Sequence, residues 1–457
     1  MTNHRFPKLY SYLGNNQFMS LAGNLAASGL GIISVSLLFR ALPIREIGVW
    51  VFFITVVGLA DSFRAGFLTT ALIRACSGAT PDRAREVTGS AWAIALGITG
   101  ALGLLSLSAW LAVGRTADAE TALLLRWFGV VLVATLPYFM ASCVLQAEMR
   151  FDRILYIRLL SQGLFVLSIG VMMLTGTASL EKVVYCYVGA SVVTSVMVLV
   201  LGWARLGSLS RRSGACIREL AEFGKYSVGS YVGSTMLRSS DSFVIKFMLG
   251  PAPLAVYNLA GRFMEIIEIP LRSFVATAMP ALSAAYNQNR LGEVAHLLRK
   301  NAGMLTWAFV PATLGAWLLA DLLIYVIGGA KYGDTEAANL LRMGMALAII
   351  YPIDRFVGVT LDVLNQPRLN LYKVLLMLVV NVVGDVTALT IWPNIYGVAL
   401  ASLPTGIAGF TFGYLHLRRH LPLSLKSIMA TGWDEGRALL ARFLGKLVPA
   451  AASSKPR

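Results

Sequence analysis

Sixteen charged side chains interrupt long apolar stretches of this sequence, and their chemistry needs explaining first. The eight basic residues are Arg64, Arg126, Arg238, Lys246, Arg262, Arg272, Arg342 and Arg355. The eight acidic residues are Asp61, Asp241, Glu265, Glu268, Asp321, Asp354, Asp362 and Asp385. Each ionised side chain costs about 2.5–3.5 kcal/mol at the centre of a bilayer, so sixteen uncompensated charges would cost roughly 40 kcal/mol if these stretches cross a membrane. The charges must therefore pair or face water.

The spacing of these residues allows pairing along single helices. The pairs are Asp61 with Arg64, Arg238 with Asp241, Arg262 with Glu265, and Glu268 with Arg272, at separations of three or four residues. Such separations put both members on one helix face. Two interpretations stay open: structural ion pairs that lock helices together, or a polar, water-filled cavity. The concentration of charges in three stretches favours the cavity, whereas Asp385 has no obvious local partner.

The composition identifies the class of protein that must position these charges. Hydrophobic residues make up 57% of the 457 residues and charged residues only 14%, against about 25% charged in a typical soluble domain. The mean hydropathy of +0.69 is equally extreme. We therefore expect an all-α polytopic membrane protein, which excludes soluble enzymes. Stretches of about 20 apolar residues predict twelve transmembrane helices. They lie at about 18–39, 47–72, 89–113, 122–145, 155–175, 183–204, 226–249, 254–282, 301–328, 337–363, 370–392 and 396–417.

The basic residues are distributed unevenly between the two sides of the predicted membrane. With the N-terminus inside, 26 of the 39 Lys and Arg residues fall on the cytoplasmic side and five on the outer side. Because cytoplasmic loops are enriched in Lys and Arg, both termini are predicted to be cytoplasmic. This bias also explains the net charge of +16 without nucleic acid as a partner.

The longest loop divides the spans into two sets of six. An ungapped shift of 207 residues places Asp61 on Glu268 and Trp50 on Tyr257, which indicates two pseudo-symmetric repeats of one orientation around a central cavity, although a chance match of apolar segments is the alternative. The predicted parts are a lobe at 1–205, a basic cytoplasmic linker at 206–225, a second lobe at 226–419 and a cytoplasmic tail at 420–457. Prolines inside spans predict kinks at Pro137, Pro270, Pro280, Pro311, Pro352 and Pro404.

The tail carries the pattern of a surface helix. Between Ser424 and Leu447, one side of a helix would collect Trp433, Leu440, Phe443, Leu444 and Leu447. Positive charge comes from Arg437, Arg442 and Lys446. The segment is too polar to span a bilayer, so it is predicted to be an amphipathic helix lying on the cytoplasmic face.

Signals for catalysis and for metal binding are missing from the sequence. There is no nucleotide-binding GxxxxGK[ST] motif, no HExxH motif and no cysteine pair with metal-ligand spacing. We therefore expect no cofactor, no metal site and no enzymatic activity.

Several short motifs resemble a known family of membrane transporters. In the first half they are residues 37–43 (LLFRALP), 46–50 (EIGVW), Gly66, 71–74 (ALIR), 145–147 (LQA) and the Arg150–Phe151 pair. In the second half they are residues 223–227 (FGKYS), 240–245 (SDSFVI), Gly250, Tyr257, Ala260 and 280–283 (PALS). Over about residues 16–419 the chain resembles Wzx-type polysaccharide flippases of the multidrug/oligosaccharidyl-lipid/polysaccharide (MOP) exporter superfamily.

The resemblance implies a twelve-helix, two-lobed flippase of the bacterial inner membrane. Such proteins move undecaprenyl-pyrophosphate-linked oligosaccharides outward for O-antigen, exopolysaccharide or capsule synthesis. The partners that the resemblance implies are the lipid-linked oligosaccharide, membrane lipids, a polysaccharide polymerase and assembly proteins. Guanidinium groups bind phosphate oxygens through paired hydrogen bonds and stay charged. The candidate headgroup ligands are Arg64, Arg238, Arg262, Arg272 and Arg355. Their charge partners, or groups that couple transport to an ion, are Asp61, Asp241, Glu265, Glu268, Asp354 and Asp385.

Three other functions compete with this interpretation. A cation-coupled multidrug exporter of the same superfamily would favour acidic and aromatic residues over arginines in its cavity. A membrane glycosyltransferase or ligase would need a large outer loop or paired acidic residues at a membrane edge, and no predicted outer loop exceeds about fifteen residues. A membrane scaffold would not need a charged stripe on one helix.

The charge bias generates a prediction of topology. A reporter enzyme that is active only in the cytoplasm, fused after Arg419, is expected to be active because the tail is inside. The same reporter inserted after Gly333, in a predicted outer loop, is expected to be inactive. A reporter enzyme that is active only outside the cytoplasm should be inactive at the same position. If that reporter alone is active after Arg419, the predicted topology is wrong.

Overall fold

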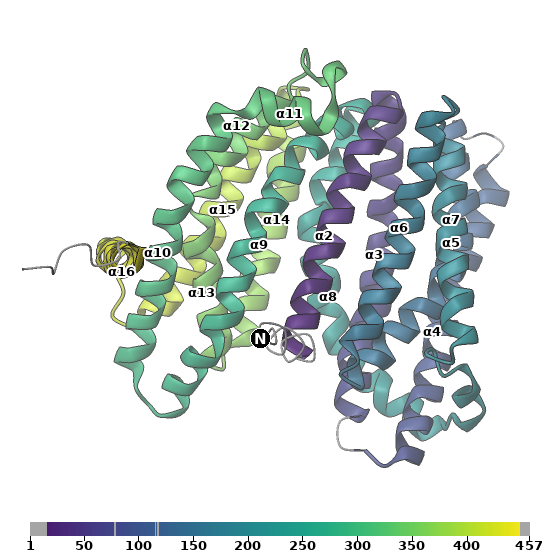
Figure 1. Cartoon of the computed structure of the whole chain (residues 1–457), viewed down its shortest axis with the longest axis horizontal. Helices are drawn as coiled ribbons and strands as arrows, with labels where there is room; N and C mark the ends of the chain where they lie inside the picture. Colours follow the sequence, from purple (N-terminus) through teal and green to yellow (C-terminus); the bar gives the residue numbers. More distant parts are fainter. Residues whose placement is uncertain (1–15, 77–78, 115, 117, 448–457) are drawn as a thin grey trace, which may run out of the picture. The chain divides into compact units, whose positions relative to one another are not determined.

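The computed structural model describes residues 16–76, 79–114, 116 and 118–447, and it is helical almost throughout (Figure 1). No strand occurs in this part of the chain. Residues 1–15, which carry the predicted cytoplasmic N-terminus, and residues 448–457 at the end of the predicted tail lie outside the described residues.

The first six predicted spans each correspond to one helix. They are α2 (Asn16–Ala41), α3 (Ile44–Cys76), α4 (Pro81–Val113), α5 (Ala119–Ala147), α6 (Phe151–Leu174) and α7 (Leu180–Val200). A short 3-10 helix, η1 (Leu206–Arg211), follows α7. The expected linker at 206–225 is thus mostly helical, because the next helix already begins at Gly214.

The second six spans include two broken helices. The elements are α8 (Gly214–Met248), α9 (Pro251–Asn287), α10 (Leu291–Leu318), α11 (Ala320–Gly328), η2 (Ala330–Tyr332), α12 (Ala337–Ala348), α13 (Tyr351–Val363), α14 (Pro367–Ile391), α15 (Ile395–Arg418) and α16 (Leu425–Leu447). The predicted span 301–328 is the pair α10 and α11, bent by 71°, and the span 337–363 is the pair α12 and α13, bent by 50°. Eight single helices and these two pairs are long and apolar enough to cross a membrane, and α2 and α8 lie at the other two predicted spans. The all-α polytopic fold is confirmed.

Contacts divide the chain into two compact units. The first runs to Ala255 and includes Val326–Gly329, and the second comprises Val256–Tyr325 and the chain from Ala330 onward. In the first unit α8 packs along α3, where the ring of Phe52 lies 5.4 Å from that of Phe243. The core of the second unit lies among α9, α10, α13 and α15. The lobes expected at 1–205 and 226–419 stay a prediction.

Polar side chains at the helix starts explain where several spans begin. A free backbone N–H in the first turn of a helix needs an acceptor, and Ser, Thr, Asp and Asn supply one. Ser179 accepts from the N–H of Lys182 in α7, and Ser213 accepts from that of Cys216 in α8. At the start of α5, Thr121 donates to the carboxylate of Asp118, and these hydrogen bonds lower the pKa of Asp118.

The prolines are a poor guide to the breaks. Helical structure continues through Pro137, Pro270, Pro280, Pro311 and Pro404. Only Pro352 lies at a break, in the first turn of α13, where a missing N–H costs no helical hydrogen bond. The break between α10 and α11 falls at Leu319, eight residues after Pro311.

Close packing of α3 on α8 generates a prediction. A side chain added at Gly66 would lie 2.8 Å from the Cα of Val228, whereas Gly58 on the same helix faces open space. Gly66→Leu should therefore push the helices apart and lower stability by about 1–3 kcal/mol, while Gly58→Leu should leave it nearly unchanged. Thermal unfolding of the purified variants in detergent measures both effects. Equal melting temperatures would contradict the close approach.

Candidate functional site

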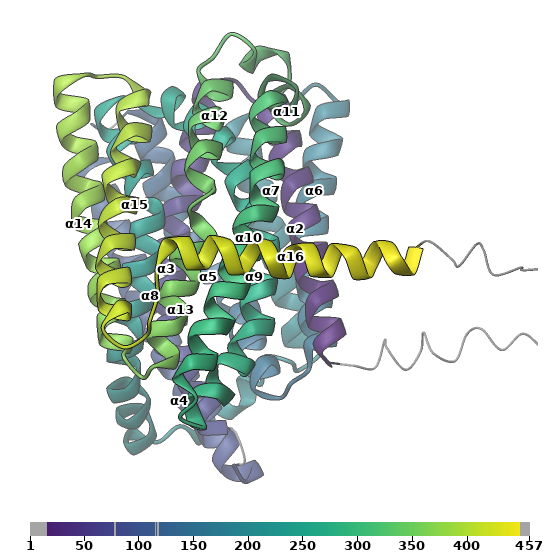
Figure 2. The same ribbon diagram turned by 90° about the vertical axis from the view of Figure 1, so that its left-hand side faces the viewer.

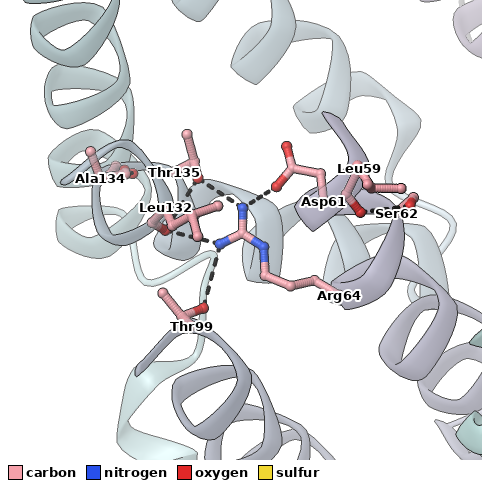
Figure 3. Close-up of polar contacts among 9 residues, drawn as sticks. Leu59, Asp61, Ser62, Arg64, Thr99, Leu132, Ala134 and Thr135 are labelled. Carbon is pink, nitrogen blue, oxygen red and sulfur yellow. Dashed lines mark hydrogen bonds and ion pairs between the residues drawn. The ribbon is translucent and has the colours of Figure 1, made fainter. Parts of the chain in front are cut away.

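Arg64 is the most deeply buried of the five candidate arginines. It lies on α3 with none of its side chain exposed, and it reaches toward α4 and α5 (Figure 3). Nη1 donates to the carbonyl oxygen of Leu132 at 2.9 Å and to the hydroxyl of Thr99 at 3.5 Å. Nη2 donates to the hydroxyl of Thr135 at 2.9 Å and to Asp61. In this conformation the guanidinium is bonded to protein groups, so binding of a headgroup by Arg64 stays a prediction.

Asp61 compensates the charge of Arg64 and also meets the surrounding medium. The two residues are separated by three positions on α3 and form the predicted ion pair, while 40% of the Asp61 side chain remains exposed. The ring of Phe139 lies 5.1 Å from the guanidinium carbon and closes another side of the pocket. Arg64 Nε has no hydrogen-bond partner among the described residues. The pair therefore joins a sealed cation to an accessible carboxylate.

The charged stripe on α9 is built from two local ion pairs, as the spacing predicts. Nη1 of Arg262 lies 3.1 Å from Glu265, and Nε of Arg262 donates to Asn258 at 3.2 Å. Farther along α9, Nη2 of Arg272 lies 2.6 Å from Glu268. Both pairs are accessible: 29% of the Arg262 side chain and 61% of that of Arg272 are exposed.

Arg238 and Arg355 are also exposed, on α8 and α13 respectively. Neither has an ion-pair partner among the residues that the structure describes. Asp354 does not pair with its neighbour Arg355. Four of the five candidate arginines are thus accessible in their own units, and Arg64 is the exception.

Lys373 is a buried cation that the sequence analysis missed. It lies on α14 with 4% of the residue exposed, and its Nζ is 2.5 Å from the carboxylate of Asp354 on α13. Lys373 is not among the sixteen charges named above, because it stands near the cytoplasmic start of the predicted span 370–392 and was counted with the cytoplasmic residues. The spacing of residues could not predict this ion pair, because Asp354 is 19 residues away on another helix. An Asp and a Lys near the facing ends of consecutive spans would have been the available signal.

The other intramembrane charges have identifiable neighbours. Asp385 is fully buried on α14 and accepts a hydrogen bond from Asn381 at 3.0 Å, one turn earlier. Lys246 lies 3.3 Å from Glu120, so the predicted outer end of α8 is held to α5. Arg342 on α12 pairs with Asp321 on α11.

One apolar groove lies between α14 and α15. It has a volume of about 480 Å³ and is lined by Gly384, Thr387, Ala388, Ile391, Trp392, Gly397, Leu400, Ala401 and Pro404. No charged residue lines the groove, so it offers no cationic side chain to an anionic headgroup. Within the described residues no three His, Cys, Asp or Glu side chains form a metal site, and the four cysteines are free thiols.

Comparisons with known proteins identify related sequences. Residues 37–337 match the model of the family described as polysaccharide biosynthesis protein. The chain is 22% identical over 264 residues to the "Probable low-salt glycan biosynthesis flippase Agl15" of Haloferax volcanii. That match covers 58% of this chain and 54% of the relative, so the chain spans about half the length of the curated protein it matches.

Solved structures show the fold. An inward-facing multidrug resistance MATE family transporter of the MOP superfamily matches with a TM-score of 0.70 and 16% identity, over 86% of this chain and 95% of that chain. The lipid II flippase MurJ, in an inward closed conformation, matches with a TM-score of 0.70 and 14% identity, over 94% of this chain and 93% of that chain. The chain therefore has the same fold as these two membrane proteins.

The contrast between the buried and exposed ion pairs generates a prediction. Asp61–Arg64 and Arg262–Glu265 have the same spacing of three residues, but only Arg64 is sealed from solvent. A double-mutant cycle with Asp61→Asn and Arg64→Met should give a coupling energy of about 1–3 kcal/mol. The matched cycle with Arg262→Met and Glu265→Gln should give about 0.2–1 kcal/mol, because solvent screens that pair. Unfolding in detergent measures both, and equal coupling energies would contradict this account.

Proposed function

The chain belongs to the polysaccharide biosynthesis protein family, and we propose that it moves a lipid-linked oligosaccharide between the leaflets of its membrane. The family match is the observation that carries this proposal. The name of the curated relative, a probable glycan biosynthesis flippase, supports it. The fold alone is neutral, since a multidrug transporter and a lipid flippase match it equally well.

We propose that the lipid carrier is undecaprenyl pyrophosphate and that arginines bind its diphosphate. A diphosphate with several hydroxyl-rich sugars cannot enter hydrocarbon unless charged partners replace its water. Guanidinium groups suit this task, because they bind phosphate through paired hydrogen bonds and cannot be deprotonated. The accessible residues Arg238, Arg262, Arg272 and Arg355 are the proposed ligands. The isoprenoid tail would stay in the bilayer.

The carboxylates have a proposed part of their own. Glu265 and Glu268 neutralise Arg262 and Arg272 when no substrate is bound, so a diphosphate would compete with them for the guanidinium groups. Asp61, Asp241, Asp354 and Asp385 are proposed as charge partners or as groups that couple transport to an ion. Asp61 is the strongest of these, because it is partly exposed while bonded to a buried arginine. Arg64 would then contribute to transport indirectly, through its ion pair with Asp61.

The cellular setting follows from the same proposal. The chain would work in the bacterial inner membrane with both termini in the cytoplasm, as a transporter with no enzymatic step. Its products would be used for O-antigen, exopolysaccharide or capsule synthesis, and a polysaccharide polymerase and assembly proteins are the proposed partners.

A cation-coupled multidrug exporter is the second candidate, favoured by the match to the MATE family structure. The two functions differ in the charge of the substrate. An exporter of cationic drugs would lose affinity when exposed carboxylates are neutralised. A flippase for an anionic headgroup would lose affinity when exposed arginines are neutralised.

Substrate binding by arginine variants tests the proposal. Arg238→Ala, Arg262→Ala, Arg272→Ala and Arg355→Ala should each weaken binding of an undecaprenyl-pyrophosphate oligosaccharide to the detergent-purified protein about tenfold or more. Hydrogen bonds to charged groups contribute about 1.5–3 kcal/mol, which corresponds to such a loss. The Arg→Lys variants should bind at intermediate affinity, because Lys keeps the charge without the planar fork.

Arg158→Ala supplies the matched control, because Arg158 is an exposed arginine in α6 outside the proposed set. It should bind like the unchanged protein. Normal binding by all four alanine variants would show that the headgroup site is wrong. Failure of the unchanged protein to bind this lipid, together with binding of a cationic drug, would favour the exporter instead.

A further inference from the structure

The C-terminal helix α16 (Leu425–Leu447) runs across the second unit rather than along it. Figure 2 shows α16 crossing α10 transverse to α14 and α15, with its C-terminal half extending past α10. The helix packs against α10. Its first half is therefore docked on the unit, and its second half leaves it.

Two glycines make the crossing possible. Gly303 on α10 and Gly432 on α16 bring the two backbones into direct contact, and a side chain added at Gly303 would lie 2.8 Å from the Cα of Gly432. A side chain added at Gly432 would collide with the backbone of Gly303. Only glycine on both helices allows this approach, so the crossing point on α10 is fixed.

Further contacts fix the direction of α16. The indole N–H of Trp307 on α10 donates to the carbonyl oxygen of Met429 at 3.0 Å, and its ring lies 4.9 Å from that of Trp433. Nζ of Lys300 lies 2.7 Å from Glu435. Ile428 is fully buried in the core of the second unit. Residues 425–435 are thus held against α10 by these contacts. We call them the docked half.

The crossing occurs at the predicted edge of the membrane. Gly303 stands at the start of the predicted span 301–328, and Trp307 lies one turn farther in. Tryptophan is enriched at the boundary between hydrocarbon and water, and two tryptophans meet at this joint. A helix that crosses α10 transversely at that depth lies in the plane of the membrane surface.

The remaining residues, 436–447, are called the outer half, and their sequence complements an anionic lipid surface. By helical register Leu440, Phe443, Leu444 and Leu447 fall within roughly a third of the circumference. By the same register Arg442 and Lys446 are expected on the other side. Arg437, which is exposed, stands at the edge of the apolar face beside Leu444. The outer half carries no acidic residue, since Asp434 and Glu435 precede it and Glu435 is paired with Lys300.

We propose that the outer half of α16 is a contact site for anionic phospholipid headgroups, held in the headgroup plane by the joint of α16 with α10. Each base near an anionic leaflet contributes about a fivefold preference, so three bases should favour anionic over neutral lipid by about a hundredfold. The preference should weaken in high salt. This proposal does not depend on the transport function.

A probe on the apolar face of the outer half tests the proposal in the full chain. Cys76, Cys143, Cys186 and Cys216 are replaced by alanine, and Leu440→Cys is labelled with an environment-sensitive fluorophore. The protein is reconstituted into phosphatidylcholine vesicles with or without phosphatidylglycerol. A lipid-embedded quencher should quench the label strongly with phosphatidylglycerol, and at least tenfold less with phosphatidylcholine alone or in high salt.

Matched charge variants locate the effect. Arg437→Gln, Arg442→Gln and Lys446→Gln combined should abolish the phosphatidylglycerol response. The control combines Arg418→Gln, Arg419→Gln and Lys426→Gln, three exposed bases outside the outer half, and should retain the response within twofold. If either variant fails to fold, the labelled protein with its bases unchanged still tests the proposal, through the comparison of vesicles with and without phosphatidylglycerol.

Three outcomes would overturn the proposal. Equal quenching by lipid in both vesicles would show a surface helix without preference for anionic lipid. Quenching only by a water-soluble quencher in both would show a helix free of the membrane. Protection from both quenchers would show that a protein surface, such as a second copy of this chain, covers the outer half.

Discussion

The compensation of charge inside an apolar helix bundle is the constraint on which this structure depends. A guanidinium that is fully removed from solvent keeps its charge only if acceptors surround it. Arg64 meets this condition through three neutral acceptors on α4 and α5 and the carboxylate of Asp61. Its position therefore holds α3, α4 and α5 together. The same rule separates the other arginines, because those that are exposed in their units need no such enclosure and remain available to a ligand.

The helices themselves were largely predictable from the sequence. A stretch that crosses a bilayer needs about 20 apolar residues, and the twelve predicted spans correspond to helices or broken helices in order. The local ion pairs on α3 and α9 were predictable because helical spacing alone brings their members together. Contacts between distant residues were not: the pair of Lys373 with Asp354, the break at Leu319 and the crossing of Gly303 with Gly432 depend on how separate helices pack.

The fold of this chain does not determine what it transports. A drug transporter and a lipid flippase share the architecture with this chain to the same degree, so the arrangement of helices cannot identify the cargo. The distinction has to come from which charges are accessible and how they are neutralised at rest. In this chain the accessible charges on α9 are arginines balanced by glutamates along the same helix. An anionic headgroup could exchange with those glutamates without leaving a cation unpaired.

Observation of lipid translocation in vesicles is the decisive test of the proposed flippase function. The purified protein is reconstituted into vesicles that contain a fluorescent undecaprenyl-pyrophosphate oligosaccharide in both leaflets, and a membrane-impermeant reductant is added outside. Without protein, the inner half of the fluorescence should remain protected. With protein, we expect the protected fluorescence to be lost, although the vesicles still exclude the reductant. Full protection in the presence of folded protein, under the conditions in which the lipid binds, would contradict the account.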